Sequence, residues 1–324
     1  MPRFSVVIPC RDAAATLPAT LASLRAQTFR DWEAVCIDDG SCDNTAEVIH
    51  RVARLDHRVQ AVSVAAGGPG LARNLGALTH ARGELIAFLD ADDLWTPDKL
   101  ATLHDLFGGR TAPDAAFARV ASFADDPGRA TPAPTVMRHT AHRAAGAPSH
   151  RLDDLTVTML LTDNPVVTMS NITLRADVFR RTCGFDVRLH RNEDLEWLIR
   201  LLAGAPVVRA IDAVQVLRRI PRRETQADIL ARRRGWQEAV ETARMLCVAP
   251  GPARTARAEA AQMRALAVAS LSIHGASAPL RLAMAVRYGF LGLTRSPAGF
   301  FQGLGAAIKA RAGLSAAPPA QAAR

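Results

Sequence analysis

Short, almost wholly apolar runs alternate with amphipathic segments through the first 107 residues of the chain. The run from Leu85 to Leu89 has no polar alternation, which is typical of a strand buried on both faces of a sheet. Strands are predicted at 4–9, 32–37, 59–64 and 85–89, and helices at 14–27, 44–54, a segment ending near 82, and 98–107. This alternation predicts an α/β fold with a doubly wound, mainly parallel sheet flanked by helices.

The pattern is less regular beyond residue 107. Strands are predicted at 115–123 and 166–174, a strand pair at 207–220, and helices at 177–183, 192–202, 229–246 and 256–271. Residues 124–149 are rich in Pro, Ala, Gly and Arg without periodicity, which predicts a long loop. The segment 280–313 mixes apolar residues, cations and glycines, and the glycines argue against a long helix there.

Carboxylates follow the apolar run from Leu85 to Leu89. Because side chains alternate along a strand, Asp90 and Asp92 are expected to point one way and Asp93 another. Open α/β sheets bind ligands outside the carboxyl ends of their strands, and one or two carboxylates with substrate phosphates typically hold Mg²⁺. The segment therefore fits a metal-bridged diphosphate. An acidic turn that caps the next helix is the alternative for an isolated Asp-x-Asp pattern.

The composition indicates whether the chain folds and in which cellular compartment it is expected. Hydrophobic residues make up 49% of the 324 residues, which is ample for a folded core. The five cysteines are odd in number and include no Cys-x-x-Cys pair, which favours a reducing cytoplasm over a disulfide framework or a zinc site. Neither a signal peptide nor a membrane-spanning stretch is predicted.

Positive charge is concentrated toward the end of the chain. The net charge is +9, yet only Lys99 and Lys309 of the 40 basic residues are lysines, so a compositional bias toward Arg contributes to it. No acidic residue follows Glu259. A basic, acid-free tail can sit on an anionic membrane, which stabilises binding by up to ~1 kcal/mol per cation, or it can bind nucleic acid.

Four motifs occur in order at the ends of predicted strands or just past them. They are Ser-Val-Val-Ile-Pro at 5–9, Asp-Asp-Gly-Ser at 38–41, Ala-Arg-Asn at 72–74 and Asp-Ala-Asp-Asp at 90–93. Their order and spacing resemble the family 2 glycosyltransferases of GT-A fold, closely over about residues 4–107 and more loosely to about 220. Any one of these motifs alone would be weak, whereas four in sequence are specific.

This resemblance implies a donor site at the strand ends. Backbone at Pro9 and Cys10 would line the nucleotide, and a carboxylate of Asp38 or Asp39 would accept hydrogen bonds from the base or ribose. The family arginine that lies near the diphosphate matches Arg73. Each has a structural alternative, namely a plain strand end, an Asx-turn at Asp-Gly, or an arginine paired with neighbouring carboxylates.

The resemblance also implies a metal site and a base. Asp90 and Asp92 match the metal-binding Asp-x-Asp, with Asp92 the more direct ligand of Mg²⁺ or Mn²⁺ and Asp90 also on the substrate side. The metal would neutralise charge on the departing nucleotide diphosphate as a Lewis acid. Asp194 matches the general base, with Glu193 as the fallback, although acidic residues in a first helical turn are favourable in any case. A single base that acts from the face opposite the leaving group implies inversion at the anomeric carbon.

The expected organisation is a GT-A domain at 1–220, with a nucleotide-binding half (1–110) and an acceptor half (111–220), followed by a basic helical extension at 221–324. The expected partners are a nucleotide-sugar donor, with UDP the commonest carrier, and a glycan or lipid-linked acceptor. Peripheral contact of 280–311 with the inner face of a bacterial cytoplasmic membrane is also expected, in assembly of a surface polysaccharide or glycolipid.

Three other functions are weighed against this one. A sugar nucleotidyltransferase uses a similar sheet and metal, but such enzymes resemble one another in an N-terminal glycine-rich loop and a catalytic lysine, whereas the first lysine here is Lys99. A catalytically silent sugar-nucleotide or polysaccharide-binding protein is disfavoured by the intact Asp92 and Asp194. Nucleic-acid binding is permitted by the charge, but no aromatic and basic platform supports it.

Overall fold

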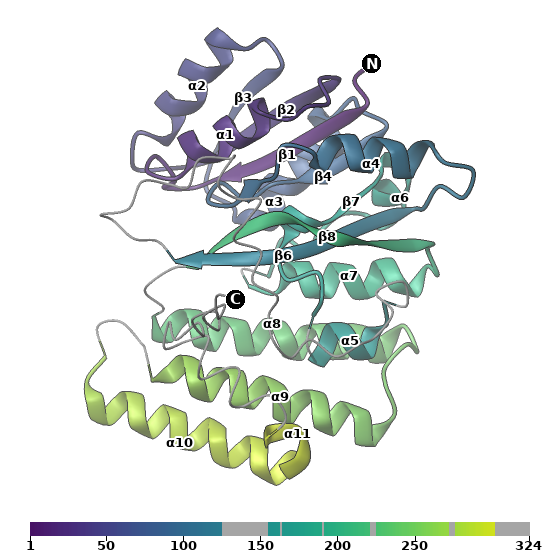
Figure 1. Ribbon diagram of the computed structural model, residues 1–324. Helices are drawn as coiled ribbons and strands as arrows, with labels where there is room; N and C mark the ends of the chain where they lie inside the picture. Colours follow the sequence, from purple (N-terminus) through teal and green to yellow (C-terminus); the bar gives the residue numbers. More distant parts are fainter. Residues whose placement is uncertain (125–154, 163, 190, 221–224, 272–275, 302–324) are drawn as a thin grey trace, which may run out of the picture. The chain divides into compact units, whose positions relative to one another are not determined.

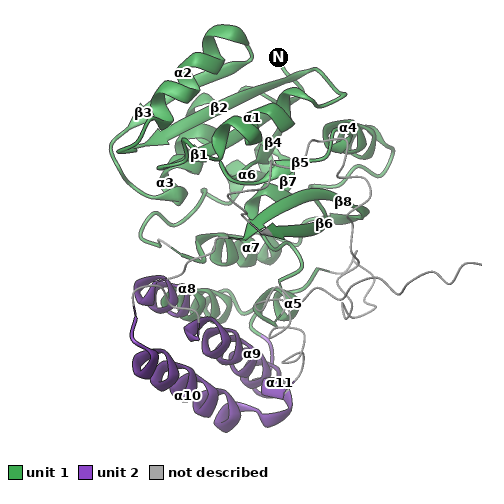
Figure 2. Ribbon diagram, turned by 60° about the vertical axis from the view of Figure 1, so that its left-hand side comes forward, with its two compact units in different colours: residues 1–143, 149–222, 234–249 green, residues 144–148, 223–233, 250–324 purple. Residues whose placement is uncertain are grey.

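The computed structural model describes residues 1–124, 155–162, 164–189, 191–220, 225–271 and 276–301 (Figure 1). The chain divides into two compact units (Figure 2). The first contains residues 1–143, 149–222 and 234–249, and the second contains 144–148, 223–233 and 250–324. The predicted loop at 124–149 falls almost wholly outside the described residues, as does the end of the chain from 302.

The first unit is built on an eight-stranded sheet with the order β3-β2-β1-β4-β7-β6-β8-β5. Its first half is parallel and consists of β1 (Phe4–Cys10), β2 (Trp32–Asp39), β3 (Val59–Val64) and β4 (Leu85–Phe88). These strands lie close to the predicted ones because β1, β2 and β4 are almost wholly buried and consist mostly of apolar residues. The predicted doubly wound sheet with flanking helices is confirmed.

The second half of the sheet is mixed. Strand β7 (Thr173–Arg175) is antiparallel to both β4 and β6 (Ala115–Ala124), β8 (Val208–Ile220) is parallel to β6, and β5 (Leu94–Trp95) is antiparallel to β8. The predicted strand at 166–174 is wrong for most of its length, since Met169–Asn171 is a 3₁₀ turn (η3) capped by the Thr168 hydroxyl. The predicted strand pair at 207–220 is one strand, β8, whose register with β6 shifts near Arg119.

Helices cover both faces of the sheet. Alternate residues of β1, β2 and β4 pack with α1 (Leu17–Arg25), α2 (Thr45–Leu55) and α4 (Lys99–Gly108) in one core. On the other side of β2, Val35 and Ile37 pack on α3 (Pro69–Asn74), which continues as a π-helical turn, η1 (Leu75–His80). Phe88 of β4 contacts aromatic rings of α6 (Ala176–Arg181) and α7 (Glu193–Ala203). A further short helix, α5, spans Val157–Thr162.

The C-terminal region is helical, as predicted. Helix α8 (Gln226–Met245) is divided between the two units at residue 233, and the second unit continues with α9 (Pro252–Ser270), α10 (Ala278–Arg295) and α11 (Pro297–Phe301). The expectation that glycines prevent a long helix after 280 is wrong for α10, which runs through Gly289 and Gly292. Gly292 faces Phe300 and Met263, so close packing offsets its poor helix propensity. No helix in the described part of the chain is long and apolar enough to cross a membrane.

Candidate active site

The carboxyl ends of the parallel strands bring the predicted donor-side residues to one edge of the sheet. Strand β1 ends beside β2, with Cys10 in register with Asp38. On the other side of β1, the N–H of Leu89, just past β4, donates to the carbonyl oxygen of Val7 at 3.0 Å. The residues that follow Leu89 therefore leave the sheet beside those that follow Cys10 and Asp39.

The acidic segment after β4 is a turn. Regular strand geometry ends at Phe88, and the N–H of Asp93 donates to the carbonyl oxygen of Asp90 at 3.1 Å. The Thr168 hydroxyl lies 3.0 Å from carboxylate oxygens of both Asp90 and Asp93. The expectation that Asp93 points away from Asp90 is wrong, because strand alternation no longer applies beyond the end of β4.

Asp93 is a buried anchor for this turn. Its carboxylate accepts hydrogen bonds from the Ser170 hydroxyl at 2.6 Å and from the Arg219 N–H at 3.0 Å. Burial and the nearby Asp90 and Asp92 raise the pKa of Asp93 to about 7. Sequence reasoning missed these hydroxyl and backbone partners because they come from η3 and β8, far along the chain.

Asp92 differs from both neighbouring carboxylates. Among the described residues no side chain donates a hydrogen bond to its carboxylate, and the residue is partly accessible to solvent. Burial and the charge of Asp90 raise the pKa of Asp92 to about 6. A group whose negative charge is disfavoured in this way would be stabilised by a bound cation.

These residues fit a divalent metal that takes most of its ligands from a substrate. The described residues contain no group of three or more His, Cys, Asp or Glu side chains arranged to hold a metal. Mg²⁺ is often held by only one or two carboxylates, with water and phosphate oxygens completing its shell. Asp92 offers a free carboxylate for this purpose, whereas one oxygen of Asp90 is already bonded to Arg73.

Arg73 links the acidic turn to α7. One terminal nitrogen donates to Asp90 and the other to Glu193, each at 2.7 Å. Arg73 is 5% exposed, and its guanidinium also lies 5.5 Å from the centre of the Phe185 ring. Burial opposes its charge, but Asp90 and Glu193 outweigh burial and raise the pKa of Arg73. Of the two partners considered for this guanidinium, the structure gives it the carboxylates; the predicted diphosphate contact stays a prediction.

The predicted base lies at the start of α7. Asn192 precedes the helix in a left-handed conformation with φ 59°, and Glu193 and Asp194 form the first turn. An oxygen of Asp194 accepts from the N–H of Leu195 at 2.7 Å. Burial and the charge of Glu193 raise the pKa of Asp194 to about 6, although the residue stays partly accessible. Glu193 is committed to Arg73, so Asp194 is the freer of the two carboxylates.

The nucleotide-side carboxylates both have backbone partners. Asp39 accepts from the N–H groups of Gly67 and Gly68 at 2.7 and 2.9 Å, which ties β2 to the glycine-rich loop before α3. Asp38 accepts from the N–H of Ser41 at 3.3 Å, so a turn at Asp-Gly is present.

The strand end next to these carboxylates is closed on its side-chain face. Cys10 is fully buried, and Pro9 is partly exposed. A hydrogen bond to Cys36 and burial raise the pKa of the Cys10 thiol. The buried thiol leaves the backbone as the part of residue 10 that could face a ligand, and the predicted nucleotide contact of Pro9 and Cys10 stays a prediction.

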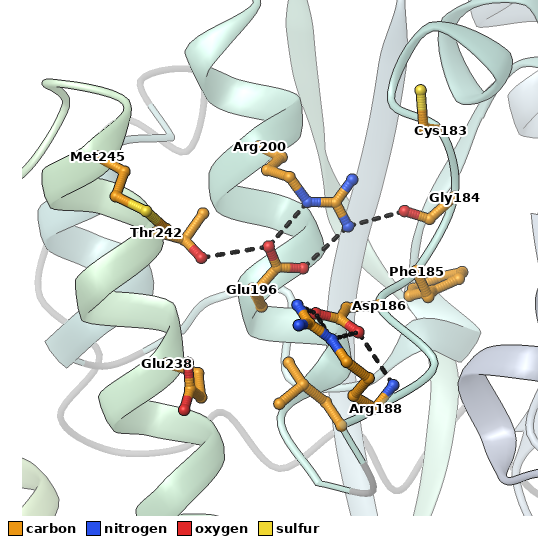
Figure 3. A pocket seen from close by; sticks show the side chains of 11 residues that line it. Cys183, Gly184, Phe185, Asp186, Arg188, Glu196, Arg200, Glu238, Thr242 and Met245 are labelled. Atoms are coloured by element: carbon orange, nitrogen blue, oxygen red, sulfur yellow. Dashed lines mark hydrogen bonds and ion pairs between the residues drawn. The ribbon is translucent and has the colours of Figure 1, made fainter.

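A separate cavity of about 350 Å³ lies between α7, α8 and the loop before α7 (Figure 3). Its charges are largely paired within the wall. Arg200 donates to both oxygens of Glu196 at 2.8 Å, and Arg188 pairs with Asp186 at 2.6 Å. None of its lining residues is a predicted site residue, and Phe185 is the lining residue that also faces Arg73.

The mixed sheet with carboxylates at the edge of its parallel half defines the class of this protein as a GT-A glycosyltransferase fold. A family model described as glycosyl transferase family 2 matches residues 5–181, which is more than half of the chain. The chain belongs to glycosyl transferase family 2.

The similarity to named relatives covers about a third of this chain. Over 98 residues, 30% of its length, this chain is 39% identical to the UDP-Glc:alpha-D-GlcNAc-diphosphoundecaprenol beta-1,3-glucosyltransferase WfgD of Escherichia coli. Over 107 residues, 32% of its length, this chain is also 39% identical to the succinoglycan biosynthesis protein ExoW of Rhizobium meliloti. The matches span 37% and 34% of those two relatives.

Solved structures extend the likeness in fold over nearly the whole chain. S. aureus TarS 1-349 in complex with UDP-GlcNAc has a TM-score of 0.53 at 17% identity, covering 95% of this chain and 81% of that one. The mannosyltransferase PcManGT of Pyrobaculum calidifontis, in complex with GDP-Man and Mn²⁺, has a TM-score of 0.57 at 19% identity, covering 96% and 86%.

Proposed function

We propose that this protein transfers a sugar from a nucleotide-diphosphate sugar, with UDP as the expected carrier, to a hydroxyl group of a glycan or glycolipid. The observation that carries the proposal is the buried Arg73, which joins Asp90 of the acidic turn to Glu193, the residue before Asp194. This link supports a single site in which donor-side carboxylates and an acceptor-side base lie together. Family membership supports the reaction class.

The donor would bind along the ends of β1, β2 and β4. In this proposal residues 1–110 form the nucleotide half, with backbone at Pro9 and Cys10 and a carboxylate of Asp38 or Asp39 facing the base or ribose. Asp92, with Asp90 behind it, would hold Mg²⁺ or Mn²⁺. When bound, the metal would supply Lewis-acid stabilisation of the diphosphate leaving group. The Mn²⁺ in the PcManGT complex is consistent with this choice.

Asp194 acts as the general base in the proposed reaction. Its carboxylate takes the proton of the acceptor hydroxyl as that oxygen bonds to the anomeric carbon, and the C1–O bond to the diphosphate breaks. The nucleoside diphosphate leaves with the bonding electrons. Attack opposite the leaving group inverts the configuration at C1, and no covalent sugar–enzyme intermediate is required. Arg73 would keep the charge of Asp90 and Glu193 in place during the step.

The acceptor would lie against residues 111–220, and residues 221–324 would form an extension to the catalytic domain. The relative WfgD is named as a glucosyltransferase that acts on a diphosphoundecaprenol-linked sugar, which supports a lipid-linked acceptor here. We therefore place the enzyme in the cytoplasm of a bacterium, in peripheral contact with the inner face of the cytoplasmic membrane, in assembly of a surface polysaccharide or glycolipid.

The direct test is calorimetric titration of nucleoside diphosphates into wild type and Asp92→Ala, with Mn²⁺ and with EDTA. One nucleotide should bind only with metal, and the substitution should abolish that binding. The matched control is Asp177→Ala, because Asp177 is an exposed acid in a surface ion pair with Arg181. Binding that ignores both the metal and Asp92 would leave a silent binding protein as the better account.

A further inference from the structure

Helix α10 has two apolar faces. Met284, Tyr288 and Gly292 lie on its buried side, where α10 packs against α9. Leu282, Val286 and Phe290 recur at the same spacing, two residues earlier, and are 60%, 61% and 66% exposed. Residues four apart stack on one face of a helix, so these three form a continuous apolar stripe directed away from α9.

Such a stripe is unusual for a helix at the surface. A surface helix normally presents polar residues opposite its buried face, and a helix that is apolar on opposite sides is normally covered on both. Within the second unit α9 covers only the inner face (Figure 2). We therefore expect a binding partner to cover the outer stripe.

The charges around the stripe identify that partner's chemistry. Arg287 is exposed and borders the stripe beside Phe290, three residues further on, and among the described residues it forms no ion pair. Residues 278–301 contain no acidic side chain, and another cation there, Arg295, is paired with Glu259 at 3.2 Å. The surface thus combines exposed apolar side chains with uncompensated positive charge. A bilayer with anionic headgroups matches both properties.

A second copy of the chain is a poorer match. Two copies that meet through a two-fold axis place the same patch on both sides of the interface. Arginines would then face arginines, with no carboxylate in α10 or α11 to neutralise them. Nor can α10 cross the bilayer, since no described helix is suited to that.

We propose that the outer face of α10, formed by Leu282, Val286 and Phe290 with Arg287, is the surface that docks on an anionic lipid bilayer. The helix would lie in the plane of the interface, with the apolar stripe among the acyl chains and Arg287 at the headgroups. This assignment rests on the proposed peripheral location and names the surface responsible for it.

The test is flotation of the full chain with phosphatidylcholine vesicles, with and without phosphatidylglycerol. Wild type should float with the anionic vesicles and less so at high salt, because salt screens the arginines. The combined variant Leu282→Gln, Val286→Gln and Phe290→Gln should bind at least about a hundredfold more weakly, since the apolar anchors are lost. Unchanged thermal unfolding would show that the variant is folded.

Matched controls distinguish binding through this surface from nonspecific binding by other exposed residues. Leu55→Gln with Leu246→Gln removes exposed apolar residues of the first unit and should leave flotation unchanged. Arg287→Gln should weaken binding to anionic vesicles by roughly fivefold. Arg254→Gln with Arg257→Gln, exposed arginines of α9, should have a smaller effect.

Three results would overturn the assignment. If the stripe variant floats like wild type, another surface binds and the peripheral location survives without α10. If wild type binds neither vesicle, both the surface and the location fall, while nucleotide binding remains a separate test of the transferase. If sedimentation shows a dimer that only the stripe variant dissociates, a second copy covers the face.

Discussion

Three neighbouring aspartates have three different surroundings. Asp90 is bonded to a buried arginine, Asp93 to hydroxyl and backbone groups, and Asp92 to no side chain in the described part of the protein. The raised pKa values of Asp92 and Asp93 share one cause, burial beside a like charge. The environment, not the residue type, therefore separates the carboxylate available to a ligand from those that build the turn.

Catalysis by Asp194 should depend on pH through its raised pKa of about 6. A base must be deprotonated to accept the hydroxyl proton, so kcat/KM should fall roughly tenfold per pH unit below about 6. Asp194→Asn should lower kcat by about 10²–10⁴ with little change in donor KM. Initial-rate kinetics from pH 5 to 8 checks both. Asp177→Asn is the control, and normal turnover by Asp194→Asn would remove it from the base role.

Lys99 is a buried cation without a hydrogen-bond partner among the described residues. Burial lowers its pKa from 10.5 to about 7. Above pH 7 the folded chain loses a proton that the unfolded chain keeps until about pH 10.5, so this group makes stability rise across that window.

Lys99→Met should therefore stabilise the first unit by on the order of several kcal/mol at pH 7, because the desolvated charge is gone. The advantage should shrink toward pH 10, where the wild-type amine is neutral when folded. Calorimetric unfolding at both pH values measures the difference. A constant advantage at the two values would mean that packing, not charge, is responsible.

At the scale of elements, the absence of a side chain at Gly235 lets α8 pack closely against the start of α7. A Cβ at Gly235 would overlap the carbonyl oxygen of Arg191 and lie 2.9 Å from the Asn192 Cβ. Backbone cannot yield cheaply at such a contact. The glycine therefore allows α8 to approach the residues that immediately precede Glu193 and Asp194.

Gly235→Ala should displace the start of α7 and lower kcat at least about tenfold, because small errors in placing a base are costly. Nucleotide affinity should change little, since in the described residues β1 and β2 pack mainly on other elements than α8. Gln237→Ala, at an exposed position of the same helix, is the control for kinetics and calorimetric binding. Wild-type kcat in Gly235→Ala would show that the loop adapts.

Two glycines of α10 make a matched pair for stability. A Cβ at Gly292 would overlap the Phe300 ring and lie 3.1 Å from the Met263 Cβ, whereas at Gly289 the nearest atom is 3.8 Å away. Gly292→Ala should destabilise the second unit by about 1–3 kcal/mol through overpacking. Gly289→Ala should stabilise it by roughly 0.5–1 kcal/mol through helix propensity. Hydrogen exchange of α9 and α10 amides reports on this unit, and equal effects would refute the packing account.

Sequence patterns predicted the elements whose partners are close in the chain. Strand β4 reads as buried because all its residues are apolar, and its neighbour β1 is apolar except for Ser5. The patterns failed where long-range contacts decide the conformation. Residues 166–172 look like a strand, but the Thr168 and Ser170 side chains are used by the acidic turn. The glycine content of α10 led to the wrong prediction that no long helix forms there, because the Phe300 ring packs against Gly292.

The same distinction holds for the candidate site. Four motifs located Asp38, Asp39, Arg73 and the acidic turn, because each follows a predictable strand or loop. The partnership of Arg73 with Glu193 spans 120 residues, and no local pattern encodes it. The three-way linkage could be seen only once the fold had brought α3 and α7 together.

At the scale of the whole molecule, the two halves of the sheet differ in how far apart their partners lie. Strands β1 to β4 pair among residues 4–88, whereas β5 pairs with β8, more than a hundred residues later. Distant pairing forms slowly because a long loop must close first. Pulse-labelled hydrogen exchange during refolding should protect amides of β1 and β2 before those of β8. Simultaneous protection would contradict this order.

The acidic turn is synthesised before the residues that bond to Asp93. It leaves the ribosome well before Thr168 and Ser170, and the Arg219 N–H that completes the bonding of Asp93 is encoded 126 residues later. At roughly 5–20 residues per second, that delay lasts on the order of ten seconds. Until then the Asp93 carboxylate lacks all three of these partners, whereas Arg73, the partner of Asp90, is already present. A chain truncated before Arg219 would therefore contain the acidic segment without the complete set of bonds that anchors it.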